Sequence, residues 1–129
     1  MITVSKKVEY SVDFLSFLSK NKGKNVSLAE VSRKMHLPYR FLSQLATDLK
    51  KSGLVRSQEG RGGGYQLSKD WEKKTFYDLV EALGENKAPV ACLGEGGCHR
   101  IAKCQQRFFW QKVGNLWQQE LKKIKLKEI

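Results

Sequence analysis

The sequence has few of the residues on which most enzymes and membrane proteins depend. It holds two histidines and three cysteines in 129 residues, and it contains no hydrolytic triad pattern and no substrate-pocket motif. No apolar run approaches the roughly 20 residues that cross a bilayer. The segment MITVSKKVEY is charged and lacks the apolar stretch of a signal peptide. We therefore expect a cytoplasmic protein that is not an enzyme, has no small-molecule substrate and does not contact a membrane.

Acidic residues are scarce relative to basic ones. The chain has 24 Lys and Arg against 13 Asp and Glu, so its formal net charge is +11. Such an excess favours a polyanionic partner, because basic side chains neutralise phosphates and release counterions. The simpler interpretation is an ordinary basic surface in contact with solvent. The net charge alone does not favour either interpretation over the other.

Apolar residues at helical spacing, interrupted by glycines, predict a mainly α fold with one small β-hairpin. The expected elements are helices over 5–20, 27–36 and 38–52, a hairpin over 54–67, a helix from Thr75 to Gly84, and a long helix from about Gln105 onward. Ser27 followed by Glu30 is a capping-box pattern, and Pro38 suits the first turn of a helix. The apolar stripe of the third helix is expected to be buried; it consists of Phe41, Leu42, Leu45 and Leu49. Two short helices with a brief turn, then a glycine-tipped hairpin, describe a winged helix-turn-helix.

The third helix and the wing would contact double-stranded DNA. Recognition helices present their N-terminal residues to base edges, so Arg40 could bind guanine and Gln44 adenine. Arg61 lies among glycines and could enter a narrow minor groove. The full set of candidates is Ser27, Tyr39, Arg40, Ser43, Gln44, Lys50, Lys51, Arg56 and Arg61. Each residue alone could be an ordinary solvated position, but the helix-turn-helix pattern, the glycine-rich wing and the net charge together favour DNA. An RNA-binding module is the less favoured alternative.

All three cysteines fall in the stretch CLGEGGCHRIAKC, at Cys92, Cys98 and Cys104. An odd number cannot pair completely, and structural disulfides are rare in a reducing cytoplasm. Structural zinc commonly uses close C-x-x-C pairs, which are absent, and His99 directly follows Cys98, which makes joint chelation of one ion awkward. An iron–sulfur cluster is larger and is also bound by thiolates, so a glycine-rich loop could wrap it. Redox-active thiols and incidental cysteines are the remaining interpretations.

The last predicted helix has a long apolar stripe. Its members, at alternating three- and four-residue steps, are Trp110, Val113, Trp117, Leu121 and Ile124, with Phe109 and Leu116 beside them. Such a stripe at the end of a small domain suits a helix that pairs with a second subunit. Packing within one chain is the alternative.

These motifs together resemble the IscR/NsrR-type bacterial transcription regulators, relatives of RirA and CymR. The matching pieces are SKKVEYSV, SLAEVSRKMHLPYRFLSQLATDLKKSGLV, GRGGGYQL and the three cysteines, so the resemblance covers essentially the whole chain. It implies a homodimer with a winged-helix domain over 1–84, a cluster-binding cysteine loop over 85–104 and a dimerisation helix over 105–129. It also implies an iron–sulfur cluster held by Cys92, Cys98 and Cys104.

The resemblance leaves one cluster position to be filled. In IscR-like members a histidine three residues after the last cysteine is a ligand, but Arg107 stands here and cannot ligate. NsrR-like members use an acidic residue from the first helix of the other subunit, and Glu9 matches that place when the sequences are aligned on Tyr10. His99 and Asp13 are the second choices. The residues do not decide between a [2Fe-2S] and a [4Fe-4S] cluster.

The function expected from these residues is transcription regulation in which the cluster controls operator affinity by a shift between conformations. Iron supply, nitric oxide, oxygen and redox state are all possible signals. The alternative is a cluster-free winged-helix regulator controlled by thiol oxidation or by a protein partner.

Overall fold

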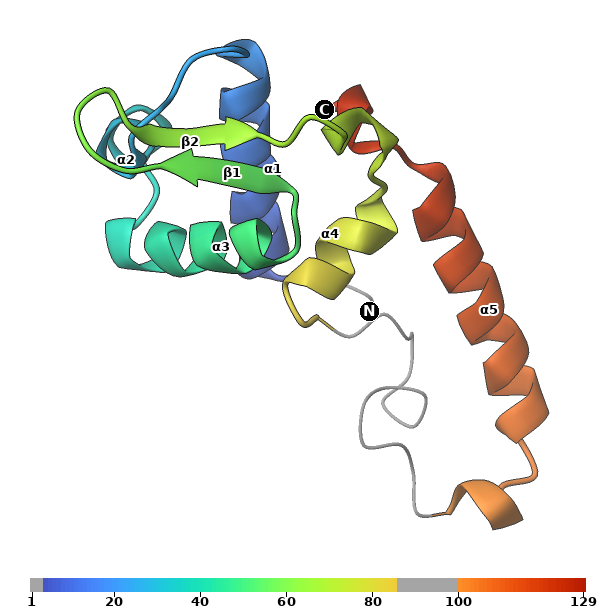
Figure 1. Ribbon diagram of the computed structural model, residues 1–129. Helices are drawn as coiled ribbons and strands as arrows, with labels where there is room; N and C mark the ends of the chain where they lie inside the picture. Colours follow the sequence, from blue (N-terminus) through green and yellow to red (C-terminus); the bar gives the residue numbers. More distant parts are fainter. Residues whose placement is uncertain (1–3, 86–99) are drawn as a thin grey trace.

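The computed structural model describes residues 4–85 and 100–129 and shows a mainly helical chain with a β-hairpin (Figure 1). In chain order the helices and strands are α1 (Lys6–Lys20), α2 (Leu28–Met35), α3 (Tyr39–Lys51), β1 (Val55–Gln58), β2 (Gly64–Leu67), η1 (Trp71–Lys73), α4 (Phe76–Ala82), η3 (Ile101–Lys103), α5 (Arg107–Lys123) and η4 (Leu126–Glu128). The predicted winged helix-turn-helix order is confirmed. Within the described ranges, no helix combines the length and the apolarity needed to cross a bilayer.

Polar side chains cap the first turns of α1, α2 and α4. The Ser5 hydroxyl accepts from the Val8 amide at 3.3 Å, and Thr75 with Asp78 forms a complete reciprocal capping box. The box predicted at Ser27 is only half formed. The Ser27 hydroxyl accepts from the Glu30 amide at 3.2 Å, but the Glu30 carboxylate pairs instead with Lys34 at 3.1 Å.

The turn between α2 and α3 has a defined conformation. His36 has a left-handed backbone with φ of 55°, which ends α2. The Leu37 amide donates to the Ser32 carbonyl oxygen at 3.1 Å, and the Ser32 hydroxyl donates to the Leu37 carbonyl oxygen at 2.6 Å. These bonds set the angle at which α3 leaves α2. Pro38 precedes the helix as its N-cap and does not occupy its first turn.

The wing is a hairpin that a third chain segment extends. β1 and β2 are antiparallel, with Val55 opposite Leu67 and Gln58 opposite Gly64. Val26 and Tyr65 exchange both backbone hydrogen bonds, at 3.0 and 2.8 Å. The segment before α2 is therefore joined to the wing.

The core lies where α1, α3 and the hairpin meet. Its most buried large side chains are Phe14, Leu15, Leu18, Leu42, Leu45, Leu49, Leu54, Leu79 and Leu126. The prediction that Phe41 is buried is wrong, because Phe41 is 36% exposed. Its ring instead meets the edge of Tyr10 at a centroid distance of 5.5 Å, at the surface between α1 and α3.

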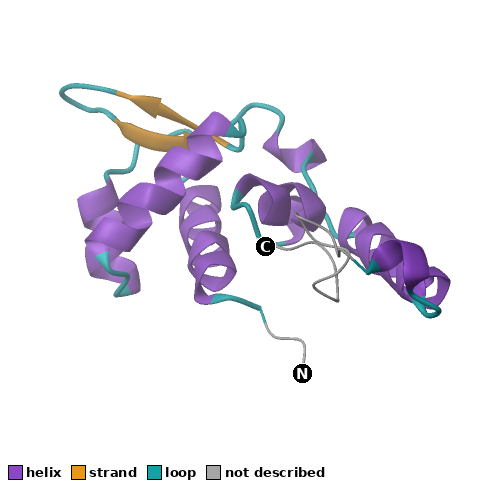
Figure 2. Ribbon diagram, turned by 90° about the horizontal axis from the view of Figure 1, so that it is seen from below, coloured by secondary structure: helices purple, strands orange, loops and turns teal. Residues whose placement is uncertain are grey.

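The C-terminal segment returns to the winged-helix domain. α5 ends at Lys123 and does not continue to residue 129 as the periodicity indicates. The Phe76 amide donates to the Ile124 carbonyl oxygen at 2.8 Å, and the Leu126 amide donates to the Lys74 carbonyl oxygen at 3.0 Å. Leu126 is 2% exposed and belongs to the core. The C-terminal end of α5 is thus fixed to the domain, while its N-terminal end projects away, on the side opposite the wing tip (Figures 1 and 2).

Candidate nucleic-acid interface and cysteine segment

The N-terminal half of α3 presents a polar face to solvent. Tyr39, Arg40 and Gln44 are exposed, and Ser43 is half-buried. Positions three and four apart share a helix face, so these side chains lie together, opposite the buried leucines of α3. The Arg40 guanidinium offers a fork of donors and the Gln44 amide offers a donor and an acceptor, which suits both to base edges. The structure therefore groups the four residues that the sequence assigns to base contact.

Three further DNA-binding candidates lie elsewhere on the same unit. Lys50 and Lys51 are exposed in the last turn of α3, about 17 Å along the helix axis from Tyr39 at 1.5 Å per residue. Their charges also interact favourably with the carbonyl end of the helix dipole. Ser27 is exposed at the start of α2, where its hydroxyl caps the helix. These three residues lie outside the Tyr39–Gln44 face.

Arg61 is exposed at the tip of the wing, between glycines with positive φ. Asn25 anchors this tip, because its side-chain amide donates to the Gly62 carbonyl oxygen at 2.9 Å and to Gln58 Oε1 at 3.0 Å. Sequence reasoning missed Asn25. Asn25 belongs to no helical or strand periodicity and to no motif. Its role becomes evident only from the pairing of Val26 with Tyr65, which brings it to the wing.

Arg56 extends the same network on the outer face of the hairpin. Its Nη2 donates to Gln66 Oε1 at 2.9 Å, and Gln66 Nε2 donates to Asn25 Oδ1 at 2.6 Å. Arg56 is exposed, so most of its donors still face solvent. It is thus set apart from the glycine tip that carries Arg61.

Cys104 is a half-buried free thiol between η3 and the start of α5. Cys92, Cys98 and His99 lie outside the described residues. Within residues 4–85 and 100–129, no group of three or more His, Cys, Asp and Glu side chains forms a metal site. A thiol at the projecting end of α5 fits a cluster ligand set by its chemistry, since thiolate is the usual iron–sulfur ligand.

Glu9 lies in the first turn of α1, with its side chain about half exposed. Its carboxylate pairs with the Lys6 ammonium at 3.0 Å, and the hydrogen bond and charge of Glu9 raise the pKa of Lys6. Asp13, one turn further along α1, is half-buried. The carboxylates of Glu9 and Asp13 can therefore be reached by a group that lies outside the core of this chain.

Arg107 begins α5 three residues after Cys104. Its guanidinium stacks over the Phe108 ring, 4.6 Å from the centroid. A guanidinium stays protonated at any physiological pH and has no acceptor, so it cannot ligate a metal. The departure from the IscR-like pattern therefore remains in the folded chain.

Comparisons with known proteins bear on both regions. The Rrf2 family model, described as iron-dependent transcriptional regulator, matches residues 4–129. The HTH-type transcriptional regulator IscR of Escherichia coli K12 is 34% identical over 104 residues, which cover 81% of this chain and 64% of IscR. The chain thus spans less than two thirds of that relative.

Solved structures agree with this match. CymR, the global cysteine regulator of B. subtilis, superposes with a TM-score of 0.74 at 28% identity, covering 98% of this chain and 95% of CymR. IscR of T. potens superposes with a TM-score of 0.69 at 27% identity, covering 98% of this chain and 84% of that protein. These relatives are regulators and not enzymes.

Proposed function

Because this chain belongs to the Rrf2 family of iron-dependent transcriptional regulators, we propose that it is a cytoplasmic, homodimeric regulator whose operator affinity depends on an iron–sulfur cluster. Cys92, Cys98 and Cys104 would hold the cluster. The observation that carries this proposal is the free, half-buried thiol of Cys104 at the projecting end of α5. Transcription regulation follows from the family itself, and the cluster and the dimer are the further proposals.

Exposed apolar side chains on α5 support the dimer. Phe108, Phe109 and Leu116 are 69%, 62% and 52% exposed. The predicted stripe is only partly exposed, since Leu121 is buried, Trp110, Val113 and Trp117 are half-buried and Ile124 is 49% exposed. Phe108, Phe109 and Leu116 are the most exposed apolar side chains of α5, so they are the ones that a second α5 would cover. Aromatic side chains bury about 150–250 Å² each, so two phenylalanines per subunit contribute substantially to such an interface.

Glu9 of the partner subunit would supply the fourth ligand. The carboxylate would leave its exposed ion pair with Lys6, which solvent screens, so the exchange costs little. Carboxylate is a harder ligand for iron than thiolate, which makes the site labile. His99 and Asp13 are the second choices for this position. A [2Fe-2S] or a [4Fe-4S] cluster would supply redox and nitric-oxide chemistry when bound.

The arrangement of α5 would carry a change at the cysteines to the DNA-reading units. Its N-terminal end bears Cys104, and its C-terminal end is fixed to the domain through Ile124 and Leu126. A shift of α5 about the dimer contact therefore changes the spacing of the two α3 helices. A dimer must fit two half-sites at once, so its operator affinity changes with that spacing.

The DNA contacts in this proposal follow the geometry of α3 and the wing. Tyr39, Arg40, Ser43 and Gln44 would read bases in the major groove. The wing-tip Arg61 would enter the minor groove. Ser27, Lys50, Lys51 and Arg56 would contact phosphates, which supply affinity without sequence preference.

A cluster-free regulator is the second candidate, controlled by thiol oxidation or by a protein partner. The observations that favour it are the structural likeness to CymR and the presence of Arg107 where IscR-like members have a ligand. Metal content separates the two candidates.

The test is anaerobic purification followed by visible spectroscopy and by iron and acid-labile sulfide analysis per chain. We expect matching iron and sulfide in the wild type, loss of both in Cys104→Ala, and faster cluster loss in Glu9→Ala. Glu30→Ala removes a half-buried carboxylate that pairs with Lys34 in α2, and it serves as the control. A colourless wild type without iron after reconstitution would contradict the cluster, and a Glu9→Ala variant identical to Glu30→Ala would move the fourth ligand to His99 or Asp13.

A further inference from the structure

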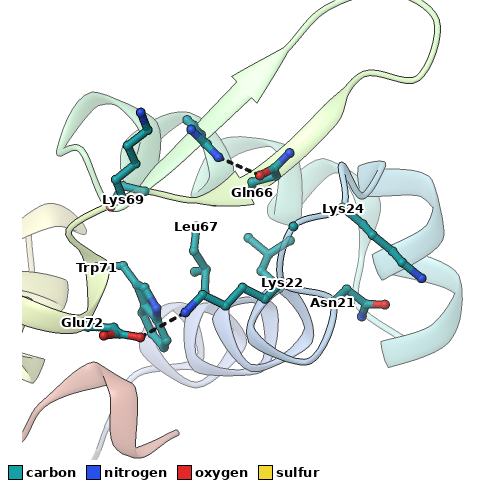
Figure 3. A pocket seen from close by; sticks show the side chains of 12 residues that line it. Asn21, Lys22, Lys24, Gln66, Leu67, Lys69, Trp71 and Glu72 are labelled. Carbon is teal, nitrogen blue, oxygen red and sulfur yellow. Dashed lines mark hydrogen bonds and ion pairs between the residues drawn. The ribbon is translucent and has the colours of Figure 1, made fainter.

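A cavity of about 250 Å³ lies between the α1–α2 connection and the base of the wing (Figure 3). Its apolar wall consists of Leu18, Leu67 and Trp71, each of which belongs to the core. Sequence reasoning did not predict this cavity, because its walls come from three segments that only the fold brings together. Its volume is below the usual 300–1,000 Å³ of drug-sized ligand pockets, so it suits a molecule of a few heavy atoms.

The polar lining of this cavity is strongly basic. Lys22, Lys24, Arg56 and Lys69 line it, against one carboxylate, Glu72. Lys22 bonds to Glu72 at 3.0 Å, and this contact lowers the pKa of Glu72. Both side chains are more than half exposed, so the pair is weak and an incoming anion can compete for Lys22. Within the described part of the chain, Lys24 and Lys69 have no carboxylate at ion-pair distance.

Trp71 adds a second, independent indication of a ligand. The residue is 4% exposed, and its indole Nε1 makes no hydrogen bond with any residue that the structure describes. Buried donors are nearly always paired, because a buried N–H without an acceptor costs free energy. Trp71 lines the cavity, so an acceptor bound there would satisfy this donor once the side chains that cover the nitrogen shift.

We propose that the cavity binds a small anion, the carboxylate or phosphate group of a free metabolite, between Lys22, Lys69 and the Trp71 indole. Charge-assisted hydrogen bonds from ammonium groups are the strong kind, and the apolar wall excludes water from one side of the ligand. The anion would touch the segment whose Asn25 anchors the wing tip, and also η1, which packs against η4 at the end of α5. The proposal does not depend on the cluster.

DNA phosphate is the competing source of the same chemistry. The cavity extends to η1, at the end of the hairpin opposite the glycine tip, whereas the base-reading residues lie on α3. Arg56 lines the cavity and is itself a proposed phosphate contact, whereas Lys69 and Trp71 lie beyond it, at the end of the hairpin away from the glycine tip. This position of Lys69 and Trp71 favours a free anion there.

The experiment uses the full-length protein, uniformly labelled with ¹⁵N and purified without oxygen. Its three tryptophans give three indole N–H signals, and Trp71→Phe assigns the one from Trp71. Inorganic phosphate and malonate are titrated separately against chloride at matched ionic strength. Lys69→Ala is the test variant, and Lys73→Ala is its control, since Lys73 is exposed on η1 and does not line the cavity. Unfolding temperatures confirm that both variants are folded.

We expect one of the two anions to shift the Trp71 indole signal saturably, with Trp110 and Trp117 unchanged. Lys69→Ala should weaken this binding roughly tenfold, and Lys73→Ala should leave it unchanged. The proposal is overturned if neither anion gives a saturable shift beyond that of chloride, or if both lysine variants weaken binding equally. It is also overturned if Lys69→Ala leaves anion binding intact and instead weakens DNA binding, which would identify a DNA phosphate contact.

Discussion

The Lys7 ammonium donates a hydrogen bond to the Leu83 carbonyl oxygen at 2.7 Å and so joins α1 to the end of α4. The same ammonium lies 3.7 Å from Asp48 Oδ2 on α3. One half-buried side chain thus connects three helices next to the point where the chain enters the cysteine segment. Lys7 is also two residues from Glu9, the proposed fourth ligand, so this contact positions the start of α1.

Lys7→Met should lower the free energy of unfolding by about 1–2 kcal/mol, because it removes a charge-assisted hydrogen bond and leaves a carbonyl oxygen unpaired. Lys6→Met is the matched control. Lys6 makes only an exposed ion pair with Glu9, which solvent screens, so its loss should destabilise the protein much less than the loss of Lys7. Urea denaturation of both variants measures the difference, and equal effects would show that the Lys7 contact does not stabilise the fold.

Gly64→Ala should destabilise the protein by about 3 kcal/mol or more, since backbone strain and a clash combine. Gly64 has φ of 145°, and an added Cβ would lie 2.5 Å from the Val26 carbonyl oxygen, which accepts the Tyr65 amide. Gly62 has φ of 71° with open space around it, so Gly62→Ala should cost only about 1–2 kcal/mol. Thermal unfolding compares the two, and the reverse order would contradict the Val26–Tyr65 pairing.

Phe109→Glu combined with Leu116→Glu should convert a dimer to a monomer. We expect the dissociation constant of the dimer to rise about 100-fold or more, as it does when central interface residues are lost. Both side chains are exposed on α5, so the monomer should remain folded. Gln111→Glu adds a negative charge at an exposed position of the same helix and is the control. Sedimentation velocity measures the species, and an unchanged dimer in the double variant would place the interface elsewhere.

Arg40→Ala and Lys50→Ala should weaken DNA binding in different ways. Loss of a base contact by Arg40 should cost about 1–3 kcal/mol and relax the preference at one base pair. Loss of a phosphate contact by Lys50 should weaken binding to all sequences equally. It should also reduce, by about 1, the slope of the logarithm of the binding constant against the logarithm of the salt concentration. Titrations at several salt concentrations, with a selected duplex and with point variants of it, separate the two outcomes. A uniform loss for Arg40→Ala would reassign it to the backbone.

Local signals in the sequence predict most of the helices and strands. Ser27 and Thr75 mark helix starts because a cap depends only on residues three positions apart. Gly60, Gly62 and Gly64 mark the wing because each adopts a positive φ that other residues disfavour. Helix spacing also places the polar face of α3 correctly.

Contacts between distant segments could not be predicted in this way. The periodicity of α3 includes Phe41 in the apolar stripe, but Tyr10 of α1 meets it at the surface. The last helix is predicted to extend to residue 129, yet α5 ends at Lys123, where the backbones of Ile124 and Leu126 pair with Phe76 and Lys74 and the Leu126 side chain is buried. The basic cavity depends on Lys22, Lys69 and Trp71, which are separated by up to 49 positions in the chain and share no motif. Helix or strand periodicity carries no information on such pairings.

The most direct measurement is operator affinity before and after cluster removal in one anaerobic preparation, using a duplex selected from a random pool. The cluster-containing and cluster-free dimers should differ at least about tenfold in Kd, within the usual range of allosteric coupling. Cys104→Ser should bind with one affinity that the same treatment does not change. Equal affinities of the two wild-type forms would contradict cluster control of DNA binding, whatever the iron content.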